Sequence, residues 1–191
     1  MNIQNIITDH IQTAQKLAVM EADILQICQL CNDAILRGHK ILLAGNGGSA
    51  ADAQHIAAEF VGRFVKERRS LPAIALTVDT SALTAISNDY GFENVYARQI
   101  EGLGTEGDVF IGLSTSGNSP NIIKAVEAAK RKGLKIIILS GKNGGILSQR
   151  DAYGKSMSDA EIIVPSDITA RIQEMHILIG HILCEYIDAH N

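Results

Sequence analysis

The chain has 191 residues, of which 46% are hydrophobic and 20% charged, with a formal net charge of −4. This length fits one domain with a substantial core, and the composition excludes a disordered chain and a membrane-spanning one. The slight negative charge argues against a nucleic-acid partner, because the basic residues form only one short run, at positions 66–69.

The N-terminal segment 3–36 is predicted to be one long helix or two, since apolar residues recur at helical spacing until Gly38. It lacks the basic start and apolar centre of a signal peptide, so we expect a cytoplasmic protein. No strand precedes the segment, which should therefore pack on a sheet or on another subunit. Its Cys28 and Cys31 lie inside the helical pattern, away from the strand-to-helix turn that activates a redox pair, and we expect buried free thiols.

Residues 40–44 predict a first buried strand, and a glycine-rich loop, GNGGSA, follows it directly. We expect a ligand loop there, because open α/β sheets bind ligands where strands end. Neither the dinucleotide spacing G-x-G-x-x-G nor the Lys-Ser/Thr ending of a P-loop is present, so both nucleotide-binding interpretations are rejected.

The helix predicted over residues 49–64 has an apolar stripe that assigns its core face. On another face, His55, Glu59 and Arg63 follow one another at intervals of four residues. Small side chains flank this polar row, which suggests that it faces another surface. The alternative is a solvated face with an ordinary helix pair between Glu59 and Arg63.

Further strands are predicted over residues 71–77, 108–113, 135–139 and 161–164. Helices are expected to begin near 81–85 and to cover 96–103 and 121–132. The polar residues 88–91 predict a turn, and the polar segment 148–159 predicts a surface excursion. Five short apolar strands alternating with helices predict an α/β fold with a doubly wound parallel sheet, in a single domain over 1–191.

A turn rich in hydroxyl groups and glycine, LSTSGNSP, occupies residues 113–120, between a strand and a helix. A helix N-terminus there offers free backbone N–H groups to an anion, and Gly117 lets the backbone approach it. Hydroxyl donors are available from Ser114, Thr115, Ser116 and Ser119. We expect a phosphate site; the alternative is a loop that only caps the next helix, with Pro120 in its first turn.

The last helix is predicted over residues 169–190, with polar groups interrupting its apolar face. Gln173 and His181 lie near one line along this helix, but His176 is also a neighbour of Gln173, at i+3. Spacing alone does not choose between the two histidines, and a lone histidine on an apolar helix is more often a core residue.

The GNGGSA loop with His55 and Glu59 in its helix, the STSGNS loop and the ARIQEMH segment together resemble the sugar isomerase (SIS) family. They are most similar to its phosphoheptose isomerases, which act on sedoheptulose 7-phosphate, and the likeness covers nearly the whole chain. The resemblance implies a flavodoxin-like sheet, and a homotetramer with active sites between subunits. The N-terminal segment, about 1–37, would take part in subunit packing.

The resemblance also implies the site residues. The catalytic pair would be Glu59 and His181. The phosphate would be held by Ser114, Thr115, Ser116 and Ser119. The sugar would be bound by Asn46, Gly47, Gly48, Ser49, Glu59, Arg63, Asn88, Asp89 and Gln173. One zinc ion per subunit would be bound by His55, Glu59, Gln173 and His181.

These side chains suit an aldose–ketose isomerisation through an enediolate. The product would supply the heptose of lipopolysaccharide or capsule. Glu59 would exchange the proton at carbon, and His181 would serve the carbonyl and hydroxyl oxygens. As a zinc ligand Glu59 would have a second role that conflicts with the first. Two segments depart from the family pattern: the excursion 148–159 is longer than is usual, and 165–170 contains no substrate contact that we can assign.

Two alternatives remain within the same fold. Noncatalytic SIS proteins bind the bacterial replication initiator, and a sugar-phosphate sensor would use the serine loop without turnover. Both are disfavoured because such relatives generally lack the carboxylate and the second histidine, whereas Glu59 and His181 are present. An isomerase acting on a pentose or hexose phosphate is the third possibility.

Overall fold

The computed structural model describes residues 2–150, 152–154 and 156–191. Its sheet contains β1 (Ile41–Ala44), β2 (Ala73–Ala75), β3 (Val109–Ser114), β4 (Lys135–Gly141) and β5 (Ala160–Val164). The strand order is β2-β1-β3-β4-β5, and every neighbouring pair is parallel. This is the flavodoxin-like order, so the predicted doubly wound sheet is confirmed.

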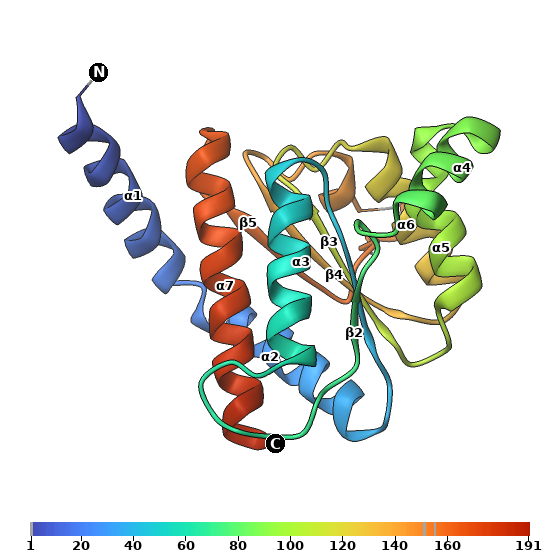
Figure 1. The fold of residues 1–191 in the computed structure, drawn as a ribbon. Helices are drawn as coiled ribbons and strands as arrows, with labels where there is room; N and C mark the ends of the chain where they lie inside the picture. The colour runs from blue at the N-terminus through green and yellow to red at the C-terminus, as the bar shows by residue number, and fades with distance from the viewer. Residues whose placement is uncertain (1, 151, 155) are drawn as a thin grey trace.

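Helices cover both faces of the sheet (Figure 1). They are α1 (Ile3–Ala18), α2 (Glu21–Leu36), α3 (Gly48–Val61), α4 (Thr80–Tyr90), α5 (Val95–Leu103), α6 (Pro120–Arg131) and α7 (Thr169–His190), with short 3-10 turns η1 (Phe92–Asn94) and η2 (Ile146–Ser148). The helices α2, α3 and α7 pack on one face, and α5 and α6 pack on the other. The first helix leaves the body of the molecule beside α7 (Figure 1). Among the described residues, none of these helices combines the length and the apolar character that a membrane span needs.

Strand β1 shows how the sequence builds two cores. Its side chains alternate between the two sheet faces. Ile41 and Leu43 join the core under α2, α3 and α7, while Leu42 and Ala44 join the core under α5 and α6. All four residues are fully buried, which is why the strand is apolar along its whole length.

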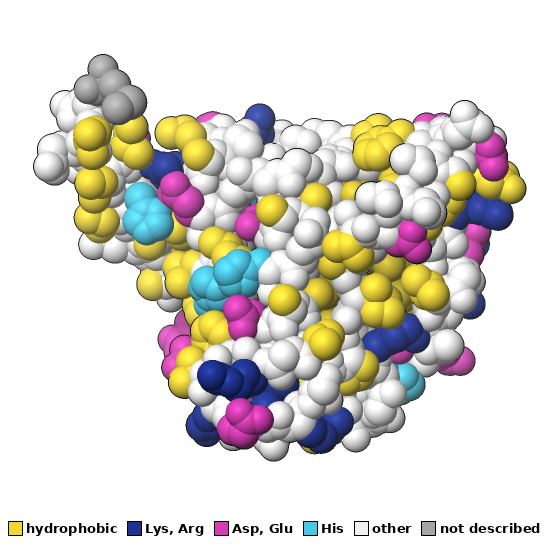
Figure 2. Space-filling model, in the orientation of Figure 1, with side chains coloured by type: hydrophobic (Ala, Val, Ile, Leu, Met, Phe, Trp, Pro, Cys, Tyr) yellow, Lys and Arg dark blue, Asp and Glu magenta, His cyan; other side chains and the backbone are white. Residues whose placement is uncertain are grey.

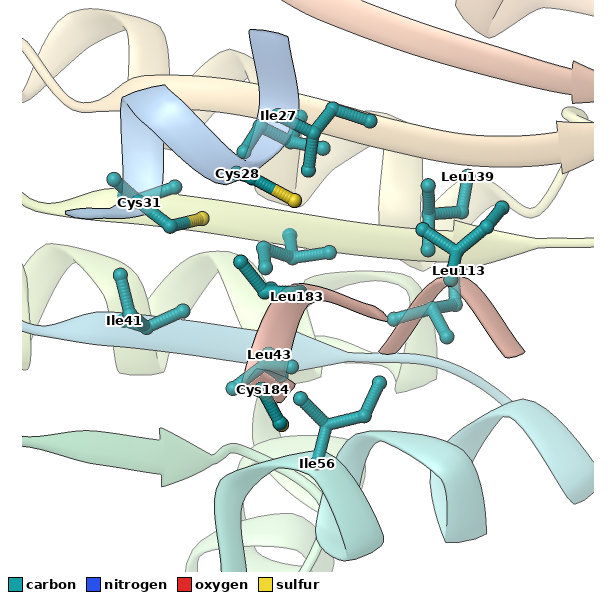
Figure 3. Close-up of a cluster of buried hydrophobic side chains, with 14 of the residues drawn as sticks. Ile27, Cys28, Cys31, Ile41, Leu43, Ile56, Leu113, Leu139, Leu183 and Cys184 are labelled. Carbon is teal, nitrogen blue, oxygen red and sulfur yellow. The ribbon is translucent and has the colours of Figure 1, made fainter. Parts of the chain in front are cut away.

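The cysteines belong to the first of these cores, among aliphatic side chains (Figure 3). Cys28, Cys31 and Cys184 are free and buried, as predicted for the first two. Burial raises the pKa of the Cys28 thiol to about 11 and that of the Cys184 thiol to about 12. At neutral pH these thiols stay protonated, and they act as small hydrophobic groups.

The structure fixes the course of three predicted segments. The N-terminal segment forms two helices, which separate at Val19 and Met20. The strand expected over 71–77 is reduced to β2. The excursion 148–159 contains an isolated antiparallel bridge between Arg150 and Ser156, while residues 151 and 155 lie outside the described part of the chain.

The predicted turn at 88–91 is wrong, whereas the helix expected to begin near 81–85 is present and is longer than expected. Helix α4 continues to Tyr90, and Gly91, at φ +83°, ends it. The polar residues that suggested a turn form the last turn of an exposed helix. Polar composition does not separate these two cases, because a solvated helix face and a turn both lack apolar side chains.

The helix predicted over residues 49–64 extends further than the observed helix. Helix α3 stops at Val61, and Gly62 leaves the helical conformation with ψ −110°. Arg63 therefore does not continue the row of His55 and Glu59. The expected Glu59–Arg63 pair is replaced by a contact of 3.7 Å between Arg63 Nε and Glu67 Oε2.

Candidate active site

The cradle loop, residues 114–119, connects the carboxyl end of β3 with α6. Ser114 is buried, and its hydroxyl lies 2.9 Å from the hydroxyl of Ser119. Ser119 occupies the N-cap position of α6 and Pro120 the first turn, as expected, but the Ser119 side chain makes no cap hydrogen bond. These two hydroxyl groups thus face each other, which is not the arrangement of a simple helix cap.

A second loop, which follows β4, supports the cradle loop from behind. Gly117 has φ +65°, and a Cβ there would collide with the carbonyl of Gly144. The Leu147 N–H donates to the Gly117 carbonyl at 3.1 Å, and the Ile146 N–H donates to Asn118 Oδ1 at 2.9 Å. Glycine is therefore required at 117 by both conformation and space.

The glycine loop after β1 is tied to the start of α6. The side-chain amides of Asn46 and Asn121 donate to each other's oxygens at 2.9 and 2.8 Å. The Tyr96 hydroxyl donates to the Gly45 carbonyl at 2.5 Å. A cavity of about 310 Å³ opens between the two ligand loops, and Asn46, Ser119 and Asn121 are among its lining residues.

Asn121 was not singled out in the sequence, although it is buried and orients the amide of Asn46. It lies in the first turn of a helix, where one polar residue gives no periodic signal. Its partner is apparent only in the folded chain, where the glycine loop meets the start of α6, 75 residues further along the sequence.

Helices α3 and α7 bring the predicted catalytic residues together. His55 and Glu59 share a face of α3, with 3.4 Å between His55 Nε2 and Glu59 Oε1. His181 reaches them from α7, and its Nε2 lies 3.2 Å from His55 Nε2. The ring of Phe64 stacks on His181 with centroids 5.6 Å apart. Histidine side chains form a surface cluster next to an acidic one on this face (Figure 2).

The two histidines of α7 have different surroundings in the structure. His176 is fully buried, and its Nε2 lies 3.0 Å from the Ser140 carbonyl. Burial lowers the pKa of His176 to about 4, so this imidazole stays neutral at physiological pH. His176 is a core residue, and His181 is the histidine that meets His55.

Gln173 contacts the glycine loop from α7. A Cβ at Gly48 would lie 2.6 Å from Gln173 Nε2, so the absence of a side chain at Gly48 makes room for this amide. Ser49 is buried in the first turn of α3, and its N–H donates to the Asn46 carbonyl at 3.0 Å. The glycine loop and α7 are thus in direct contact.

Other predicted sugar-binding residues bond to groups outside this cluster. The guanidinium of Arg63 donates to the carbonyl of Val65 at 3.4 Å and lies beside Glu67. Asn88 donates to Asp89 Oδ1 at 2.8 Å on α4, which Figure 1 shows on the opposite side of the molecule from α7. Within the part of the chain that the structure describes, these residues form no hydrogen bond or ion pair with Glu59 or His181.

Asp52 is a carboxylate near the site that the sequence analysis did not identify. It lies about one helical turn before His55, and its Oδ2 is buried with no hydrogen-bond partner among the described residues. Burial raises the pKa of Asp52 to about 6, and the charge of His55 opposes this shift. In the sequence, nothing separated Asp52 from the other polar residues of this helix.

Part of the predicted zinc donor set has the spacing of zinc ligands. Ligands of a tetrahedral zinc ion with bonds of about 2.0–2.1 Å are roughly 3.3 Å apart. The distances from His55 Nε2 to His181 Nε2 and to Glu59 Oε1, 3.2 and 3.4 Å, fit two edges of such a tetrahedron. The described residues include no complete group of three or more His, Cys, Asp or Glu side chains set for a metal. His55, Glu59 and His181 are suitable zinc ligands chemically and two of their edges have the expected length, while the Gln173 amide is a weaker ligand.

Comparison with known proteins gives consistent results. The sequence matches the SIS domain family over residues 7–141. It is 57% identical over 188 residues to a phosphoheptose isomerase of Nitratiruptor sp., covering 98% of this chain and 97% of that protein. The fold is similar to the phosphoheptose isomerase GmhA from Neisseria gonorrhoeae, with a TM-score of 0.89, 44% identity and 98% and 97% of the two chains covered. A phosphoheptose isomerase from Francisella tularensis gives a TM-score of 0.88 at 37% identity, covering 98% and 96%.

Proposed function

This chain belongs to the phosphoheptose isomerases of the SIS family, and we propose that it converts sedoheptulose 7-phosphate to D-glycero-D-manno-heptose 7-phosphate. The observation that carries this proposal is the meeting of His55 and Glu59 on α3 with His181 on α7. A carboxylate and an imidazole in one cluster can share the two proton transfers of an aldose–ketose isomerisation.

The reaction moves a carbonyl from C2 to C1. In our proposal the Glu59 carboxylate removes a proton from C1, the electron pair forms the C1–C2 double bond of an enediolate, and the same group returns a proton to C2. His181 moves the hydroxyl proton from O1 to O2, so that atoms and charges balance. The cradle loop holds the phosphate, which is remote from C1 and C2, and so fixes the reacting end at the pair.

We further propose one zinc ion per subunit, held by His55, Glu59, Gln173 and Nε2 of His181, so that the second oxygen of Glu59 and Nδ1 of His181 would remain for the proton transfers. Bound there, zinc would polarise the sugar oxygens and stabilise the negative charge of the enediolate. Two of the edges between these donors have the length that zinc requires. A histidine pair beside a carboxylate is also the donor chemistry that zinc prefers.

One experiment tests both proposals. The protein is incubated with sedoheptulose 7-phosphate, fructose 6-phosphate and ribulose 5-phosphate, with and without a chelator, and the aldose H1 signal is followed by NMR. We expect turnover of sedoheptulose 7-phosphate alone, loss of turnover after chelation, and recovery with zinc. Turnover of another ketose would reassign the substrate, and undiminished turnover after complete metal removal would reject the zinc. No turnover of any ketose would favour a binding protein.

We propose that the protein works in the cytoplasm as a homotetramer with active sites between subunits. The support is the exposed apolar stripe of α1, where Ile3, Ile7 and Ile11 are 60%, 47% and 49% exposed. The side chain of His55 is also 49% exposed in one subunit, which is unusual for a closed active site.

Sedimentation equilibrium tests this assembly. We expect a mass of about four times 20.5 kDa, and a smaller species for Ile7→Glu, because a charge in the apolar stripe opposes burial. Lys16→Glu, a charge change on the same helix outside the stripe, is the control and should leave the mass unchanged. A monomeric wild-type protein at micromolar concentration would contradict the proposal.

A further inference from the structure

A buried ion pair joins the segment after α3 to the last helix. Arg68 follows α3, and Asp188 lies near the end of α7. Their side chains are each only 3% exposed, and Arg68 Nε donates to Asp188 Oδ1 at 2.7 Å. The proposed mechanism assigns no role to either residue, and 120 residues separate them in the sequence.

Other N–H groups of Arg68 cap the helix that carries Glu59. Arg68 donates from Nη2 to the Glu59 carbonyl at 2.8 Å, and from Nη1 to the Phe60 carbonyl at 3.0 Å. Carbonyls in the last turn of a helix lack intrahelical partners, and a cation is favoured at that end by the helix dipole. This one guanidinium therefore holds the last turn of α3.

Asp188 fixes the same segment from the side of α7. Its Oδ2 accepts hydrogen bonds from the backbone N–H groups of Val65 at 2.8 Å and Lys66 at 2.9 Å. Burial acts to raise the pKa of Asp188, but these two N–H groups and the Arg68 guanidinium outweigh it and hold the pKa below its usual value. The residue before Val65 is Phe64, whose ring stacks on His181. Asp188 thus also helps to hold the ring that packs on this histidine.

We infer that Arg68 and Asp188 are positioning residues that set the relative position of Glu59 and His181. The inference rests on the proposed isomerase function, since it assigns these two groups to the reaction. Arg68 contacts Glu59 only through its backbone carbonyl, and Asp188 lies about two turns beyond His181 on α7. The bonds of the pair go to each other and to backbone groups, so the pair acts through the helices. Displacements of about 1 Å at reacting groups can cost on the order of a hundredfold in rate.

Two mild substitutions separate positioning from mere stability. Arg68→Lys keeps the charge but loses the planar fork that bonds several acceptors at once, and Asp188→Asn keeps the shape of the side chain without its charge. Arg69→Lys is the matched control, because Arg69 is the next residue in the chain, it is exposed, and the substitution is the same as at Arg68. All variants are compared with wild type in kcat, KM, circular dichroism and thermal midpoint, at temperatures where each is folded.

We expect kcat to fall by about tenfold or more in Arg68→Lys and Asp188→Asn, with KM within about twofold, because the cradle loop is unaffected. The control should match wild type. A lower thermal midpoint with unchanged kcat in both variants would overturn the inference, since it would show a purely structural pair.

A second measurement does not depend on turnover. In wild type the close contact of the His55 and His181 rings should give an NOE between their imidazole protons, and we expect this NOE to weaken in both variants. An unchanged NOE in both would overturn the inference. If the wild-type protein turned over no ketose phosphate, the proposed function would fail, while the NOE would still report whether the pair positions the two histidines.

Discussion

Replacing Glu59 by Gln, or His181 by Ala, is expected to lower kcat by about a hundredfold or more, with KM changed much less. The Glu59→Gln change keeps the shape of the side chain, but an amide cannot accept a proton from C1. The His181→Ala change removes the imidazole that serves the two oxygens and also its contact of 3.2 Å with His55. Both constants are obtained from initial rates with sedoheptulose 7-phosphate. The rates are measured on variants whose circular dichroism spectrum matches that of the wild type.

The control for this pair is Glu185→Gln. Glu185 is exposed on α7, one turn after His181, and forms no hydrogen bond or ion pair with the described residues, so the substitution removes a carboxylate near the site that does not bond to the cluster. We expect wild-type constants for it. If Glu59→Gln and His181→Ala were folded and isomerised the substrate at the wild-type rate, the catalytic assignment would be wrong.

Gly117→Ala is expected to raise KM for the phosphorylated substrate by about tenfold or more. A methyl group at this position would collide with the Gly144 carbonyl, and φ +65° is itself unfavourable for alanine. Backbone cannot move aside as a flexible side chain does, so the cradle loop must shift. Ser119→Ala removes only one hydroxyl, and we expect a severalfold rise in KM. Competition by inorganic phosphate gives an independent measure of the same site.

The Gly38→Ala variant separates the effect of the collision at position 117 from the effect of a positive φ on alanine. Gly38 also has a positive φ, of +84°, but a Cβ there would meet nothing within 4 Å. It lies at the opposite end of β1 from the glycine loop, so we expect a modest loss of stability and an unchanged KM. An unchanged KM in both Gly117→Ala and Ser119→Ala would count against the cradle loop as the phosphate anchor.

The fold was largely readable from the chain because burial on both faces of a parallel sheet leaves a strong local signal. Residues 108–113 are almost wholly apolar, and they form most of β3. The predicted ligand loops follow β1 and β3, since the direction of a strand fixes which of its ends meets the next loop. The turn at 88–91 was predicted wrongly because an exposed helix end and a turn have the same polar composition.

The sequence by itself determined that His55 and Glu59 share a helix face, because residues four apart in a helix always do so. It could not choose between His176 and His181, which are both compatible with the spacing of α7. The packing of α7 on the sheet and on α3 made that choice: His176 is buried against β4, and His181 meets His55.

The pairs Asn46–Asn121 and Arg68–Asp188 were likewise decided by tertiary structure alone. Periodicity and turn composition describe neighbours within one or two turns of the chain. Contacts across 75 or 120 residues depend on how helices and loops pack over the sheet, which no local pattern contains.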